Sequence, residues 1–304
     1  MAIIILRNQN ILISAILMCA LFKIETTFKI PHLFFPELAA LSYGLFTNSH
    51  RNWLNDSRGV LFAPFLCSMI GVLSFIFLKN SAVSLFVAFV GGFLVLKVLN
   101  SSITPSISAG LFAIQFEIST FQYSLNILII SFLLILTGRI LGKLNNHNSF
   151  LLAEAEPSKR LSRSEFIYVL LWFLIAILSS KYLNYREIIL PPLFVILIET
   201  AKNATKLNLT QIFKVTGAVL IVSYMSILLK QGLGFNIYII ISVLVLTNLI
   251  IKMAKIDVPP LFALSLLPLI LPTYTIFSPL ITTVSLLFSL IGLTILCKKI
   301  RITN

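Results

Sequence analysis

The sequence consists largely of apolar runs that are separated by short polar connections, and most charged side chains lie between the runs. A helix of roughly 20 residues crosses the hydrocarbon core of a bilayer, which is about 30 Å thick. We therefore expect the runs to form transmembrane helices. They cover approximately residues 11–22, 30–46, 60–78, 81–99, 103–116, 124–142, 166–180, 188–201, 212–229, 235–251, 258–271 and 274–297.

The composition predicts an integral membrane protein. Of the 304 residues, 58% are hydrophobic and 11% are charged, and the mean hydropathy is +1.02. A soluble domain has about 25% charged residues, so a soluble chain of this size would lack the polar groups to cover its surface. These values exclude a water-soluble enzyme, a coiled coil and a disordered chain. The expected fold class is all-α, a polytopic transmembrane helical bundle of about twelve segments.

The two halves of the sequence match at a constant offset of 155 residues. Leucine matches carry little weight in such a chain, but the offset also pairs prolines, lysines and an asparagine, which are Pro36 with Pro191, Asn48 with Asn203, Lys97 with Lys252, Pro105 with Pro260, and Lys143 with Lys298. This pattern predicts an internal duplication. We expect two parallel six-segment repeats, residues 1–142 and 166–304, joined by a polar cytoplasmic linker over residues 143–165.

The basic residues predict the orientation in the membrane. With twelve crossings and the N-terminus inside, seventeen of the 23 lysines and arginines fall on the cytoplasmic side. The positive-inside rule then places both termini in the cytoplasm. The expected location of the protein is the cell membrane. The net charge of +13 is spread over short loops, so we expect no binding of nucleic acid. The expected partners are the lipid bilayer and a small-molecule or ion substrate, and the sequence is compatible with a homo-oligomer.

Four of the runs are short and carry a proline near their start. Proline suits the first turn of a helix, and the residue before it is pushed toward extended geometry. The segments IPHLFFPELAALSYGLF and EIILPPLFVILIE therefore predict an extended entry followed by a helix from Pro36 or Pro191. The segments LNSSITPSISAGLFAI and KIDVPPLFALSLL predict helices that start near Pro105 and Pro260.

Such a helix, about 17 Å long, cannot cross the bilayer core, so its first turn would lie at membrane depth. Its free N–H groups and its positive dipole end would then suit an anion. The alternative is that each proline starts an ordinary tilted helix at the interface. The predicted substrate-binding residues at these starts are Pro36, Glu37, Thr104, Pro105, Ser106, Pro191, Pro192, Asp257, Pro259 and Pro260.

Several of the polar residues near these starts allow two interpretations. Glu37 either complements the helix dipole or is a proton-coupling carboxylate. Asp257 is expected to cap the following helix, and Ser108 either lines the site or bonds back to a helix carbonyl. Lys97 and Lys252 are either snorkelling anchors or charges that steer an anion inward.

No motif of a known catalytic chemistry is found. The chain contains no HExxH, GxSxG or Walker sequence. His32, His50 and His147 are scattered, and the three cysteines (Cys19, Cys67 and Cys297) lie in apolar runs with no CxxC pair. We therefore expect no enzyme, no metal site and no cofactor.

Three segments resemble the HPP family of integral membrane proteins, namely PELAALSYGLFTNSHRNW, SRGVLFAPFLCSMIGVL and LNSSITPSISAGLFAI. The third is placed where that family carries its His-Pro-Pro element. Here the positions read Ile103-Thr104-Pro105 and, in the second half, Val258-Pro259-Pro260, so the role of the histidine is not carried over. The resemblance implies a transporter of small anions, similar to the nitrite transporters of plant plastids.

The leading functional prediction is a multi-pass transporter or permease for a small, anionic solute. The six-segment layout also resembles the aromatic-acid exporter class, which usually adds a soluble domain. A membrane scaffold that transports nothing and a channel are the remaining alternatives.

Overall fold

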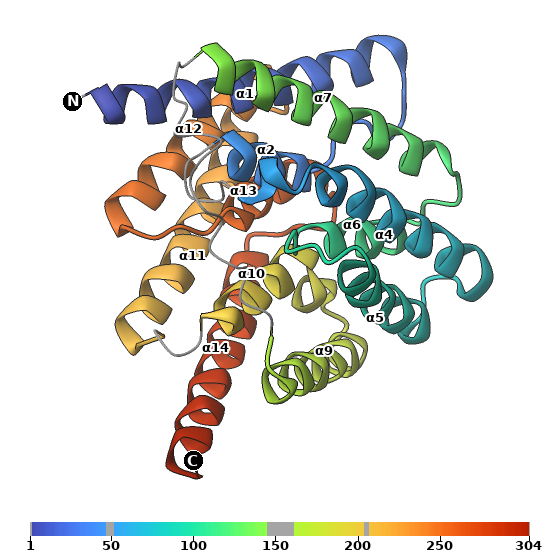
Figure 1. Ribbon diagram of the computed structural model, residues 1–304, viewed down its shortest axis with the longest axis vertical. Helices are drawn as coiled ribbons and strands as arrows, with labels where there is room; N and C mark the ends of the chain where they lie inside the picture. The colour runs from blue at the N-terminus through green and yellow to red at the C-terminus, as the bar shows by residue number, and fades with distance from the viewer. Residues whose placement is uncertain (1, 47–51, 145–160, 204–206, 304) are drawn as a thin grey trace. The chain divides into compact units, whose positions relative to one another are not determined.

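A computed structural model of the chain describes residues 2–46, 52–144, 161–203 and 207–303 (Figure 1). These residues form helices and no strand, so the all-α class is confirmed for the described part of the chain. The chain divides into two compact units, Met1–Ser158 and Lys159–Asn304. The linker lies largely outside the described residues, as do Asn48 and the side chains of Lys143 and Lys298.

The first unit is organised around one long helix, α4, which contacts α5, α6 and α7, while α2 contacts α1 and α7 (Figure 1). Polar caps define the starts of α4 and α5. Asp56 accepts a hydrogen bond from Gly59 N at 2.9 Å, and Ser81 forms a capping box with Ser84. The helices are α1 (Ala2–Phe28), α2 (Glu37–Phe46), α3 (Asn52–Asn55), α4 (Ser57–Leu78), α5 (Ala82–Val98), α6 (Ser106–Gln115) and α7 (Gln122–Leu144).

The second unit is organised around α11, which contacts α12, α13 and α14, while α10 contacts α9, α13 and α14. Asn208 and Asn236 cap α11 and α12 by accepting hydrogen bonds from backbone N–H groups three residues later. The elements are α9 (Arg163–Leu183), the 3-10 helix η2 (Arg186–Ile189), α10 (Pro191–Lys202), α11 (Leu209–Leu233), α12 (Ile237–Ala254), α13 (Pro260–Ile270) and α14 (Ser278–Thr303).

Among the described residues, six helices are long and apolar enough to cross a membrane, whereas twelve segments were predicted. They are Ser57–Leu78, Gln122–Leu141, Arg163–Leu183, Leu209–Leu233, Ile237–Ala254 and Ser278–Cys297. The apolar helices Ala82–Val98, Ser106–Gln115 and Pro260–Ile270 are shorter. Exposed Leu125, Ile129, Phe132, Leu136 and Ile140 form one face of α7, as expected of a helix whose outer side meets lipid. These helices are compatible with a membrane protein.

Two local predictions differ from the structure. The run 11–22 is part of a longer helix, α1, because the polar residues that precede it are helical as well. The stretch before Pro191 was predicted to be extended, but residues 186–189 form the 3-10 helix η2. Its Ile188 N–H donates to Tyr185 O at 3.4 Å, so the turn satisfies backbone groups that an extended chain would leave unpaired.

Candidate functional site

The four proline-led helices begin at the predicted places. α2 begins at Glu37, directly after Pro36, and α6 begins at Ser106 with Pro105 as its N-cap. In the second unit α10 begins at Pro191, and α13 begins at Pro260. Proline is tolerated there because the first helical N–H has no intrahelical partner to lose. Six prolines at these starts are buried, namely Pro36, Pro105, Pro191, Pro192, Pro259 and Pro260.

The backbone N–H groups at these starts are engaged, although free donors were predicted. Leu38 N donates to Phe35 O at 3.2 Å, and Ser108 N donates to Pro105 O at 3.1 Å. Leu193 N in α10 and Leu261 N in α13 also bond to carbonyls three residues back. These 3-10 bonds tighten the first turn, so any attraction for an anion comes mainly from the helix dipole.

The starts of α2 and α6 meet at Glu37 in the first unit. Glu37 is 1% exposed, and neither of its carboxylate oxygens has a hydrogen-bond partner. The carboxyl lies beside the hydroxyl of Ser108, which donates to Pro105 O at 2.5 Å. Ser106, in the same turn of α6, is fully buried, and its hydroxyl has no partner. An unsatisfied buried polar group costs about 1–3 kcal/mol, so this cluster calls for a functional explanation.

Tyr123 of α7 completes this polar centre, and the sequence analysis did not single it out. Its side chain is 1% exposed, its hydroxyl donates to Ala109 O at 3.0 Å, and it interacts electrostatically with Glu37. The ring packs edge-on against Phe35 at 5.9 Å and His32 at 6.3 Å. Tyr123 lies between Gln122 and Ser124, directly before the predicted run 124–142, so the sequence offered no clear signal for it.

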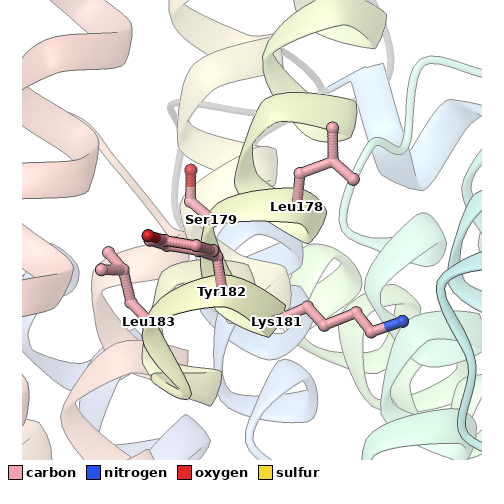
Figure 2. A pocket seen from close by; sticks show the side chains of 5 residues that line it. All are labelled: Leu178, Ser179, Lys181, Tyr182 and Leu183. Carbon is pink, nitrogen blue, oxygen red and sulfur yellow. The ribbon is translucent and has the colours of Figure 1, made fainter.

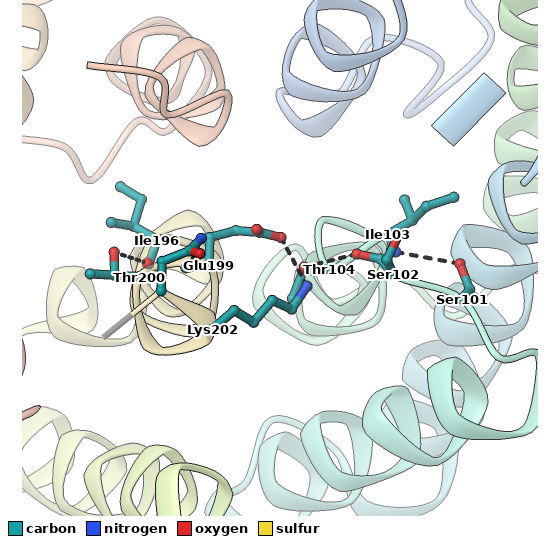
Figure 3. A network of polar contacts seen from close by, with 9 residues as sticks. Ser101, Ser102, Ile103, Thr104, Ile196, Glu199, Thr200 and Lys202 are labelled. Atoms are coloured by element: carbon teal, nitrogen blue, oxygen red, sulfur yellow. Dashed lines mark hydrogen bonds and ion pairs between the residues drawn. The ribbon is translucent and has the colours of Figure 1, made fainter. Parts of the chain in front are cut away.

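Hydrogen bonds to the start of α4 hold the segment that leads into α6. Ser101 Oγ donates to Asp56 Oδ2 at 2.7 Å, and Ile103 N donates to Ser101 Oγ at 3.4 Å. Thr104, which is 1% exposed, donates from Oγ1 to Ser102 O at 3.2 Å (Figure 3). Asp56 therefore caps α4 and at the same time fixes the connection that delivers Pro105 to the site.

The proline-led starts of the second unit carry no acidic side chain. Asp257 is exposed and does not cap α13, whose N-cap is Pro259 with no side-chain hydrogen bond, so the capping prediction was wrong. An aspartate caps from the N-cap position itself, whereas Asp257 lies two residues before the N-cap Pro259, and Pro259 and Pro260 have no N–H to donate. At the other end of α10, Glu199 pairs with Lys202 at 3.3 Å (Figure 3).

The two lysines that were predicted to steer an anion lie at helix ends. Lys97 is exposed in the last turn of α5, and Lys252 is partly exposed in the last turn of α12. A cation in the last turn complements the helix dipole, and the proposed steering of an anion by these lysines stays a prediction.

An open hollow at the end of α9 contains none of the predicted site residues. Its side chains, shown in Figure 2, are Leu178, Ser179, Lys181, Tyr182 and Leu183. Tyr182 is 90% exposed. Tyrosine and lysine at the end of an apolar helix are typical of the membrane–water interface.

Within the described part of the chain, no three histidine, cysteine, aspartate or glutamate side chains are grouped so that they could hold a metal ion. Comparison of the sequence with protein-family models and with curated proteins finds no match, and comparison with solved structures finds none either. The resemblance to the HPP family stays a prediction from the sequence.

Proposed function

We propose that the chain is a multi-pass transporter of a small, anionic solute in the cell membrane, with both termini in the cytoplasm. Its solute site would lie at the starts of α2 and α6, around Glu37. The observation that carries this proposal is a buried carboxyl, without hydrogen-bond partners, between two proline-led helix starts. Ionisable groups in membrane segments are costly, and they usually belong to a solute or ion pathway.

The geometry of the two short helices supports a site at membrane depth. α2 and α6 have 10 residues each and are therefore about 15 Å long, half the thickness of the bilayer core. In the predicted topology α2 enters from outside and α6 enters from the cytoplasm. Two short helices that enter from opposite faces can bring their first turns together only inside the bilayer. Non-helical backbone is tolerated there where it lines a cavity or is buried in protein, as in transporters with interrupted helices.

A repeated helix crossing supports the proposed duplication into two six-segment repeats. In the first unit α4 and α6 cross at Gly71 and Gly110, where a Cβ on Gly71 would lie 2.1 Å from Gly110 O. The positions 155 residues later are Ser226 and Ser265, and Ser226 Oγ donates to Ser265 O at 2.6 Å. Small residues thus allow a close crossing at the same place in both units.

The two proposed repeats differ at the polar centre. The position 155 residues after Glu37 is Pro192, and those after Ser106 and Ser108 are Leu261 and Ala263. We therefore assign the polar part of the site to the first unit and an apolar lining to Pro191, Pro192, Pro259 and Pro260. Transport is proposed rather than catalysis because the Ser108 and Tyr123 hydroxyls donate to backbone carbonyls and the sequence carries no motif of a known catalytic chemistry.

Uptake by liposomes that contain the purified protein tests the proposal. The panel consists of labelled nitrite, nitrate, formate, acetate and benzoate, and we expect at least one of them to accumulate inside. Replacing both Ser106 and Ser108 by alanine should reduce its uptake about thirtyfold, since each lost polar interaction in a buried site is worth roughly 1 kcal/mol and about 1.4 kcal/mol corresponds to tenfold. The control is Ser242→Ala, because Ser242 bonds to Tyr238 O within its own helix, α12. No uptake of any of the five anions, or full uptake by the double variant, would contradict the proposal.

A further inference from the structure

Two helix starts lie at Glu37. α2 begins at Glu37 itself, and Ser108, in the first turn of α6, lies beside the carboxyl. Each helix N-terminus acts as at most about half a positive charge. Together they offset no more than about one negative charge, which is the charge of an ionised Glu37 or of one monovalent anion.

No further positive charge at this place is found among the described residues. α2 contacts α1, α3 and α7. Ser108 of α6 lies beside Glu37, the first residue of α2. Of the side chains on these elements, the titratable group that interacts electrostatically with Glu37 is Tyr123 of α7. His32 packs on the ring of Tyr123 and is half-buried in the connection before α2. An ionised Glu37 and a bound anion would therefore repel each other, because the site is poorly solvated and the two helix starts balance only one negative charge.

We propose that Glu37 and the solute anion compete for the field of the two helix starts, so that the anion binds only when Glu37 is protonated and each anion crosses with one proton. This inference rests on the proposed function. A proton from the water on one side forms the O–H bond of the carboxyl when the anion binds. The same bond breaks on the other side, where the proton and the anion leave together. A sodium ion is disfavoured as the coupling ion because it would face the positive ends of both helices.

The competition between an ionised Glu37 and the anion has a measurable effect on the affinity for the anion. Above the pH at which Glu37 titrates, the apparent affinity for the anion falls about tenfold per pH unit, because binding requires one proton. The Glu37→Gln variant carries a permanently neutral side chain of nearly the same size. It should bind the anion with an affinity that does not change with pH.

Liposomes with a trapped pH-sensitive dye test the coupling, with nitrite and formate as probes. In the wild type, an acidic exterior should drive accumulation at a rate at least tenfold above that of protein-free liposomes, which neutral formic and nitrous acid also enter. A sodium gradient should drive none, and the dye should report one proton entering per anion in this excess uptake. Glu37→Gln should lose the protein-dependent accumulation driven by pH, and the affinity it retains for the anion should not change with pH. The matched control is Glu199→Gln, because Glu199 is paired with Lys202 at the end of α10 and should leave coupling unchanged.

The possible failures are distinguishable. Uptake that is driven by sodium, or that carries no proton into the dye-loaded vesicles, overturns the coupling and leaves the proposed transport function standing. Accumulation driven by pH in Glu37→Gln also overturns it. If neither probe moves in the wild type under any gradient, the proposed function fails together with the coupling. The proton entry that exceeds that of protein-free liposomes is measured on the wild type, so a Glu37→Gln protein that fails to fold does not prevent a decision.

Discussion

Replacing Gly71 by alanine tests the packing that places α6 at the candidate site. A Cβ on Gly71 would lie 2.1 Å from the carbonyl oxygen of Gly110 and 2.7 Å from its carbonyl carbon. Both are backbone atoms, so no side chain can rotate away to make room. The two helices must therefore move apart by about 1.3 Å before the contact reaches the ordinary distance of 3.4 Å.

The magnitude follows from this forced displacement. Overpacking that shifts backbone costs about 1–3 kcal/mol, and occasionally more. A Gly→Ala change inside a helix by itself gains up to about 1 kcal/mol, which offsets part of that cost. We expect Gly71→Ala to lose about 2 kcal/mol of stability. Since 1 kcal/mol corresponds to roughly 2–4 °C in domains of 150–250 residues, its Tm should fall by about 4–8 °C. The displacement also moves Ser108 away from Glu37, so uptake should fall as well.

Thermal unfolding of the purified protein in detergent, followed by tryptophan fluorescence, measures this effect. The matched control is Gly217→Ala in α11, where an added Cβ would meet no atom within 4 Å. That variant should melt at the wild-type temperature or slightly above it. If Gly71→Ala melts together with Gly217→Ala, the two helices do not cross in the way described and the reasoning is refuted.

Two further variants test the hydrogen bonds that hold each unit. Ser226→Ala removes the hydroxyl that donates to Ser265 O at 2.6 Å. An interhelical bond of this kind in a membrane protein is worth about 0.6–1.7 kcal/mol, so the Tm should fall by several degrees, while Ser242→Ala should leave it unchanged. Asp56→Ala removes the cap of α4 and the acceptor of the Ser101 hydroxyl, and it should cost about 1–2 kcal/mol in the same melting assay. Asp56→Asn keeps an acceptor oxygen and should recover most of that loss, and equal melting of the two Asp56 variants would contradict the assigned capping role.

The helix starts were predictable because they follow from local chemistry. Proline lacks an N–H and has a fixed backbone angle, so Pro36, Pro105, Pro191 and Pro260 each mark a helix start to within one residue. The all-α class followed from the apolar runs in the same way.

The partners of the polar residues were not predictable. Asp257 was expected to act as a cap but is exposed, because the two prolines after it move the helix start beyond its reach. Tyr123 was overlooked because it lies in a polar stretch before the apolar run, and the sequence does not show which residue of a helix faces a neighbouring helix. That direction depends on the rotation of each helix about its axis, which neighbouring helices set by packing.

Apolar helices, four of them short and led by proline, follow from the amino-acid order alone, since hydropathy and proline act over a few residues. That Glu37, Ser108 and Tyr123, from three helices, lie together in one buried place follows only from how the helices pack. The position of α6, which carries Ser108, depends on its close approach to α4 at Gly71 and Gly110, where neither residue has a Cβ. Such an approach is a property of two surfaces packed together, and no local spacing in the chain encodes it.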